Sequence, residues 1–204
     1  MVSFHTDFPH LKFIDLGGGL GVQYQPVLNN IKITLDYSSL ININEDEKSD
    51  EDLFLNSLRE GLHRLKNMLK ENGMGSVELW MEPGRYLVAE MGVLGVEVTQ
   101  TKRKGSHDYV GVNSGMNSLI RPALYDAYHH AVNLSRMEEP HDHVIQLVGP
   151  ICESGDILNP SLTFPITTKD PDLVMIATVG AYGFTMSSNY NVRPNGIQYL
   201  LDLI

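Results

Sequence analysis

Residues 11–21 read Leu-Lys-Phe-Ile-Asp-Leu-Gly-Gly-Gly-Leu-Gly, a short apolar run that stops at a cluster of glycines. This pattern predicts a buried strand that opens into a tight loop. Residues 77–81, Val-Glu-Leu-Trp-Met, predict a second strand, and residues 82–85, Glu-Pro-Gly-Arg, follow it directly. Between the strands, residues 50–72 carry leucines at spacings of three and four, which predicts a helix that ends at Gly73. Strand, loop, helix and strand form a parallel α/β unit.

The second part of the chain has a different pattern. Four segments are rich in β-forming residues and are separated by glycine, proline and polar turns: 93–101, 109–113, 144–148 and 173–179. This predicts a mostly β domain. The sequence therefore divides into residues 1–92 and residues 93–204, and we expect the end at Ile204 to cut into the last strand of the second part.

Composition limits the classes of function. The 204 residues are 42% hydrophobic and 20% charged, which is typical of a globular protein. The one cysteine, Cys152, cannot form an internal disulfide, which favours a reducing cytosol or organelle stroma. The sequence contains no run of about 18 apolar residues, so no membrane span is predicted. A net charge of −10 argues against a nucleic-acid partner. The one basic cluster, residues 102–104, precedes Gly105 and predicts a solvated hairpin tip.

The glycine cluster at residues 17–21 is open to several interpretations. Glycines leave backbone N–H groups free to bind a phosphate, because no Cβ blocks its approach. A dinucleotide site would need a third glycine where Val22 stands. A methyltransferase-like nucleotide site is an alternative, since Asp36 lies near the position of a ribose-binding acid. Pro26 leaves little room for the long helix of that fold. The remaining interpretation is a tight turn without ligand.

The loops at residues 17–21 and 82–85 both follow predicted strands. We therefore expect them at the same carboxyl-terminal edge of the sheet, where parallel sheets bind their ligands. Next to a phosphate-binding loop, Arg85 is suited to bidentate capture of an anion. A surface ion pair with Glu82 is the alternative.

Cys152 lies in the run Gly-Pro-Ile-Cys-Glu-Ser-Gly-Asp at residues 149–156, which brings together a thiol and two carboxylates. An inert structural cysteine is expected inside an apolar run, so a reactive thiol is the competing interpretation. The histidines at residues 129–130 and at 141 and 143 lack a third ligand with convincing spacing. We interpret them as satisfied or solvated side chains and predict no metal site.

Five segments resemble, in order, the motifs of diaminopimelate decarboxylases. They are IDLGGGLG at 14–21, EPGR at 82–85, GMNSLIRPALY at 115–125, CESGD at 152–156 and GAYG at 180–183. Ornithine and arginine decarboxylases share the first two motifs, whereas the third and fourth resemble the diaminopimelate branch. These enzymes combine a TIM-type (β/α)8 barrel that binds pyridoxal 5'-phosphate with a mostly β domain of the alanine-racemase C-terminal type. The resemblance implies that residues 1–92 are the last part of such a barrel and residues 93–204 the β domain.

The resemblance also implies functional residues for the cofactor. Glu82 would pair with the pyridine nitrogen, and a protonated ring is the electron sink of the reaction. Cofactor binding is implied for Gly17, Gly18, Gly19, Glu82, Pro83, Gly84, Arg85 and Tyr182.

The implied substrate is meso-2,6-diaminopimelate, and the implied products are L-lysine and CO2, a step of lysine biosynthesis. Cys152 would protonate the carbanion carbon, and Glu153 would bind the far ammonium. In such enzymes the loop with Cys152 serves the partner subunit's active site, so a homodimer is implied. Substrate binding is implied for Arg85, Arg121, Tyr125, Glu153 and Tyr182.

One feature departs from the family. The family holds its cofactor through a Schiff base to a lysine near the amino end of the barrel, and no lysine of this chain lies in that motif. A complete barrel needs roughly 250 residues, so the chain resembles the second half of such an enzyme. We expect no decarboxylation by the chain alone. A catalytically inactive homologue, or a dimerisation partner for a full-length subunit, is the alternative.

Overall fold

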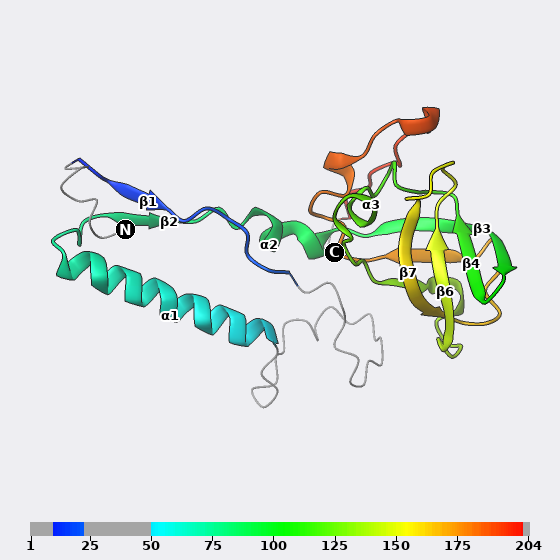
Figure 1. The fold of residues 1–204 in the computed structure, drawn as a ribbon, viewed down its shortest axis with the longest axis horizontal. Helices are drawn as coiled ribbons and strands as arrows, with labels where there is room; N and C mark the ends of the chain where they lie inside the picture. Colours follow the sequence, from blue (N-terminus) through cyan, green and yellow to red (C-terminus); the bar gives the residue numbers. More distant parts are fainter. Residues whose placement is uncertain (1–9, 23–49, 202–204) are drawn as a thin grey trace. The chain divides into compact units, whose positions relative to one another are not determined.

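The computed structural model describes residues 10–22 and 50–201, which form two compact units (Figure 1). The first unit holds residues 10–19 and 50–83. The second holds residues 20–22 and 84–201 and is called the sheet domain below. Pro26 and Asp36, which bear on the methyltransferase interpretation, lie outside the described residues.

The first unit is a strand–helix–strand arrangement. Strands β1 (Phe13–Asp15) and β2 (Glu78–Trp80) pair in parallel, and helix α1 (Asp50–Glu71) connects them in sequence. The predicted elements are confirmed, but the predicted burial of the strands is wrong. The rings of Phe13 and Trp80 stack with their centroids 4.2 Å apart, and the two residues are 45% and 49% exposed. They are exposed because the sheet has two strands among the described residues. The TIM-type barrel remains a prediction.

Helix α1 follows its sequence pattern closely. Its last turn ends in a Schellman motif: the N–H of Met74 donates to the Leu69 carbonyl at 2.8 Å, and Gly73 adopts φ +76°. Met74 and Leu69 are both buried, which is the apolar contact that accompanies this motif. The apolar stripe is half-buried or buried at Leu58, Leu62, Leu65 and Leu69.

The sheet domain is built on six strands in the order β5-β8-β3-β4-β6-β7. Their bounds are β3 Leu94–Lys104, β4 His107–Val112, β5 Ala131–Asn133, β6 His143–Val148, β7 Ile157–Phe164 and β8 Leu173–Ile176. Neighbours are antiparallel except for β4 and β6. The Asn159 side chain on β7 donates to the His129 carbonyl, 3.0 Å away and just before β5. The sheet therefore nearly closes into a barrel.

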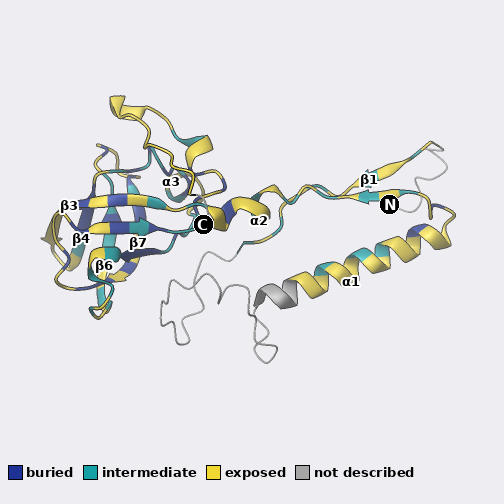
Figure 2. Ribbon diagram, turned by 180° about the vertical axis from the view of Figure 1, so that it is seen from behind, coloured by how far each residue is buried: buried dark blue, intermediate teal, exposed yellow. Residues whose placement is uncertain are grey.

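Buried residues of this sheet, dark blue on the ribbon in Figure 2, form one apolar core. Its members include Val96, Val98, Val110, Val112, Leu119, Ile145, Leu147, Leu158, Leu162, Phe164, Val174 and Ile176. Four of the six strands agree with the predicted segments. Two strands were not predicted: β5, which has three residues, and β7, where Asn159-Pro160-Ser161 interrupts the β pattern.

The turn between β3 and β4 confirms the prediction for the basic cluster. Lys104 pairs with His107 across a turn that begins at Gly105, whose φ is +62°. Residues 102–104 are all exposed. The cluster is therefore a solvated hairpin tip.

Short helices complete the sheet domain: α2 (Gly84–Val88), η2 (Ala89–Met91), α3 (Arg121–Tyr125), η3 (Leu134–Arg136), η4 (Phe184–Met186) and η5 (Tyr190–Val192). Residues 84–91 belong to this unit, and the proposed boundary at residue 92 remains a prediction. Within the described ranges, no helix has the length and apolar character that crossing a membrane requires.

Candidate functional site

The glycine loop and the Glu82 loop lie side by side in the first unit. The parallel pairing of β1 with β2 continues past the strands, because Leu16 N–H donates to the Trp80 carbonyl and Glu82 N–H donates to the Gly17 carbonyl, both at 2.9 Å. A Cβ at Gly18 would fall well inside van der Waals contact with the Glu82 carbonyl oxygen. The expected meeting of the two loops at one sheet edge is confirmed, and glycine at 18 is what allows it.

Two residues of the glycine loop adopt the left-handed backbone conformation. Gly17 and Gly19 have φ of +71° and +81°, which only glycine adopts without strain. The Asp15 carboxylate accepts the Gly17 N–H at 2.8 Å, which stabilises the turn. Glu82 beside it is exposed. Residues 17–19 therefore offer a backbone without side chains next to the exposed carboxylate of Glu82.

Arg85 belongs to the sheet domain, at the start of α2. It is half-buried, and its Nη2 lies 3.5 Å from the Leu20 carbonyl oxygen, at the limit of a hydrogen bond. Pro83 is half-buried and Gly84 is exposed. The guanidinium is therefore held near the end of the glycine loop within its own unit.

Tyr182 is presented by a segment that packs tightly on η2. Gly180 N–H donates to the Ala89 carbonyl at 2.9 Å, and a Cβ at Gly180 would approach the Gly92 nitrogen to 2.8 Å. Tyr182 itself has φ +64° and is 46% exposed. A left-handed tyrosine is uncommon and marks a locally strained backbone. The packing of Gly180 therefore fixes where the exposed phenol lies.

Gly180→Ala tests this packing. We expect it to destabilise the sheet domain by about 1–3 kcal/mol, because the added methyl group overlaps backbone atoms that have no room to move. Urea unfolding followed by circular dichroism measures the change. Gly95→Ala is the matched control, since a Cβ at Gly95 meets nothing within 4 Å. Equal stability of the two variants would contradict the predicted overlap.

Cys152 and Glu153 lie at the tip of a loop that Asp156 organises. Both residues are exposed. The buried Asp156 carboxylate accepts the Met116 N–H at 2.6 Å and the Ile151 N–H at 2.5 Å. Burial raises the pKa of Asp156, and the two backbone hydrogen bonds oppose this rise. The loop with the thiol is therefore tied to residues 115–116, which begin another of the five motifs.

Tyr190 in η5 contacts Glu153, and the sequence pattern did not predict this contact. Its hydroxyl donates to the Glu153 carboxylate, and this hydrogen bond is the main reason that the pKa of Tyr190 is raised. Cys152 lies close enough to add to the same shift. The sequence analysis gave no signal for this pair, because 37 residues separate the partners.

Helix α3 presents Arg121 and Tyr125 very differently. Arg121 is 5% exposed, and its Nη1 lies 3.0 Å from His129 Nε2. Tyr125, four residues later, is 61% exposed. The helix ends at Asp126, which adopts the left-handed conformation. Arg121 is thus anchored inside the domain, while Tyr125 faces outward.

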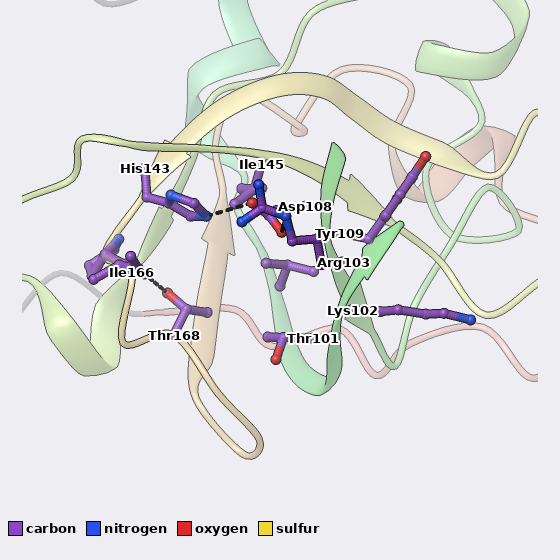
Figure 3. Close-up of a pocket in the computed structure, with 11 residues that line it drawn as sticks. Thr101, Lys102, Arg103, Asp108, Tyr109, His143, Ile145, Ile166 and Thr168 are labelled. Carbon is purple, nitrogen blue, oxygen red and sulfur yellow. Dashed lines mark hydrogen bonds and ion pairs between the residues drawn. The ribbon is translucent and has the colours of Figure 1, made fainter. Parts of the chain in front are cut away.

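A separate cavity of about 280 Å³ is lined by residues of β3, β4 and β6 and by residues 165, 166 and 168, which follow β7 (Figure 3). The Asp108 carboxylate lies 3.1 Å from His143 Nε2 and 3.9 Å from Arg103 Nε. None of the implied catalytic, cofactor or substrate residues lines this cavity. In the part of the chain that the structure describes, no three His, Cys, Asp or Glu side chains form a group suited to a metal.

Comparisons with known proteins agree with these features. Residues 23–180 match the family described as pyridoxal-dependent decarboxylase, C-terminal sheet domain. The diaminopimelate decarboxylase of Aquifex aeolicus is 33% identical over 94% of this chain and 39% of its own length. The enzyme of Campylobacter jejuni is 38% identical over 90% of this chain and 38% of its own length.

A solved structure supports the same assignment. The crystal structure of diaminopimelate decarboxylase from M. jannaschii in complex with L-lysine matches with a TM-score of 0.71 at 28% identity. The match covers 95% of this chain and 39% of that protein. The chain thus spans about two fifths of the length of these relatives. It belongs to the pyridoxal-dependent decarboxylase family and carries the C-terminal sheet domain of the diaminopimelate decarboxylases.

Proposed function

We propose that this chain supplies the carboxyl-terminal part of a pyridoxal 5'-phosphate-dependent decarboxylase that converts meso-2,6-diaminopimelate into L-lysine and CO2. The observation that carries the proposal is the contact between the glycine loop and the Glu82 loop, where Glu82 N–H donates to the Gly17 carbonyl and Gly18 packs on the Glu82 backbone. In this proposal residues 1–92 belong to the cofactor-binding barrel and residues 93–204 to the β domain. A reducing cytosol or organelle stroma is the proposed location.

The residues of the first unit fit a cofactor of this kind. Gly17, Gly18 and Gly19 offer a backbone without side chains, as a phosphate requires, and the exposed Glu82 carboxylate is available to hold a protonated ring nitrogen. The bound cofactor supplies an electron sink for the carbanion left when CO2 departs. Pro83, Gly84, Arg85 and Tyr182 complete the proposed cofactor-binding set.

The sheet domain supplies the proposed proton and the grip on the substrate. Cys152 holds a proton on Sγ at an exposed loop tip, from which it can reach a substrate carbon. Glu153 next to it binds the far ammonium, and the Tyr190 hydroxyl fixes its carboxylate. The loop serves the partner subunit's active site in this proposal, so the working form is a homodimer. Substrate carboxylate is bound by Arg85, Arg121, Tyr125 and Tyr182.

Complementation tests the proposal. The chain is co-expressed with the amino-terminal three-fifths of the Aquifex aeolicus enzyme, which supplies the remainder of a barrel, and L-lysine formation from meso-2,6-diaminopimelate is measured with added pyridoxal 5'-phosphate. We expect lysine formation from the complex and none from either part alone. A stable complex that binds the cofactor and forms no lysine would contradict the proposed activity.

Two further measurements separate the alternatives from this proposal. A catalytically inactive homologue would co-purify with a full-length subunit and leave lysine formation unchanged. A methyltransferase would gain thermal stability from S-adenosylmethionine and none from pyridoxal 5'-phosphate. The comparisons favour the decarboxylase family over the methyltransferase interpretation.

A further inference from the structure

His129 lies in the loop between α3 and β5 and is fully buried, with 0% exposure. The backbone of His129 and of the next residue is held by hydrogen bonds from β7 and from the residue after β8. The Asn159 side chain on β7 donates to the His129 carbonyl at 3.0 Å. The Ala177 N–H, just after β8, donates to the carbonyl of His130 at 2.8 Å. The ring of His129 therefore has little freedom to move.

The hydrogen bonds of the ring select one protonation state. Nδ1 lies 3.1 Å from the Ala177 carbonyl oxygen, which can only accept, so Nδ1 carries the hydrogen. Nε2 lies 3.0 Å from Arg121 Nη1, which can only donate, so Nε2 carries a lone pair. One neutral tautomer satisfies both contacts, whereas a protonated ring would turn an N–H toward the guanidinium.

The surroundings favour the same neutral form. Burial lowers the pKa of His129 most strongly, the hydrogen bond to Ala177 partly opposes this, and the positive charge of Arg121 lowers the pKa further. His129 therefore acts as an acceptor for Arg121 at neutral pH.

From this geometry we infer that His129 is a positioning residue, whose Nε2 lone pair fixes the orientation of the Arg121 guanidinium. A guanidinium is a planar fork with five N–H donors, and binding a carboxylate through two of them requires a set plane. The contact with His129 uses one donor, and rotation of the plane breaks it. The inference rests on the proposed function for one point, that the group presented by Arg121 meets a substrate carboxylate.

The neighbouring histidine provides a matched control. His130 also has a lowered pKa, because of burial and the nearby His141. Its Nδ1 lies 3.0 Å from the Tyr128 hydroxyl, and its hydrogen bonds do not involve Arg121. His130→Gln should therefore leave the Arg121 signals unchanged.

Nitrogen NMR on the 204-residue chain tests the inference directly. We expect His129 to show a protonated Nδ1 and an unprotonated Nε2 at pH 7.5, and Arg121 to show slowly exchanging Nη protons. His129→Leu, which has no acceptor, should speed the exchange of the Arg121 Nη1 proton that faces Nε2. His129→Gln, whose side-chain oxygen can replace Nε2, should retain the slow exchange. The opposite ring tautomer in the unmodified chain, or unchanged Arg121 signals in His129→Leu, would overturn the inference. The first of these readouts needs no variant to fold.

Kinetics of the complemented enzyme separate this inference from the proposed function. His129→Leu should raise KM for meso-2,6-diaminopimelate about tenfold with a smaller change in kcat, and His129→Gln should recover most of that loss. If the ring shows the expected tautomer and the complex forms no lysine, the proposed function is wrong and the positioning role stands. If lysine forms and His129→Leu leaves KM unchanged, the positioning role is wrong.

Discussion

Asp156→Ala is expected to destabilise the sheet domain by about 2–5 kcal/mol, because it leaves one buried and one half-buried backbone N–H group without an acceptor. These are the N–H groups of Met116 and Ile151. The loss should also release the Cys152 loop, which Asp156 ties to the rest of the domain. Urea unfolding measures the free energy, and proteolysis at residues 152–155 measures the release of the loop. A loss below 1 kcal/mol would show that the N–H groups find other acceptors.

The controls for this experiment separate charge from shape. Asp142 is an exposed aspartate of the same domain, so Asp142→Ala should have little effect. Asp156→Asn keeps one side-chain oxygen and should be milder than alanine. Since the pKa of Asp156 is raised in the folded domain, proton binding to this carboxyl group adds stability at acidic pH. This proton-linked part is lost as the pH rises through the raised pKa, whereas the hydrogen bonds to the two backbone N–H groups remain. Asp156→Asn should remove this part of the pH dependence.

Cys152→Ala is expected to lower kcat of the complemented enzyme about 100–10,000-fold, the range for loss of a positioned proton donor. KM should change much less, because Sγ is proposed to act on the carbanion and not to bind the substrate. Initial rates of L-lysine formation measure both constants.

Ser154→Ala is the control for damage to the loop, since Ser154 is exposed two residues away. It should retain nearly full activity. A Cys152→Ala variant with more than about a tenth of the original kcat would mean that another group or water delivers the proton.

Sequence patterns predicted the elements whose stability is local. The leucine stripe of α1 and its end at Gly73 follow from helical periodicity and from the positive φ that a Schellman turn requires. The hairpin between β3 and β4 follows from its turn residues. The meeting of the two loops of the first unit could also be predicted, because parallel strands place the loops that follow them at one edge.

The remaining features depend on contacts between distant residues. Asn159 and Pro160 have low β propensity, so the sequence pattern does not predict β7. The place of β7 is fixed by its pairing with β6. His129 was predicted to be a satisfied or solvated side chain. Its ring is indeed satisfied, by Arg121 eight residues away and by the Ala177 carbonyl 48 residues away. The sequence pattern does not reveal the fold that brings these three residues together. The hydrogen bond of Tyr190 to Glu153 was missed for the same reason.

Trp80, which stacks on Phe13, is an intrinsic fluorescent probe of the two-stranded sheet. Trp80 is the one tryptophan among 204 residues, and its indole Nε1 is bonded to Glu78 at 2.9 Å while nearly half of the side chain meets solvent. Fluorescence excited at the red edge of the absorption spectrum therefore comes from the surface of the two-stranded sheet alone. A polypeptide that covers the two strands would remove Trp80 from water and shift this emission to shorter wavelength. Binding could therefore be followed without a dye or a label.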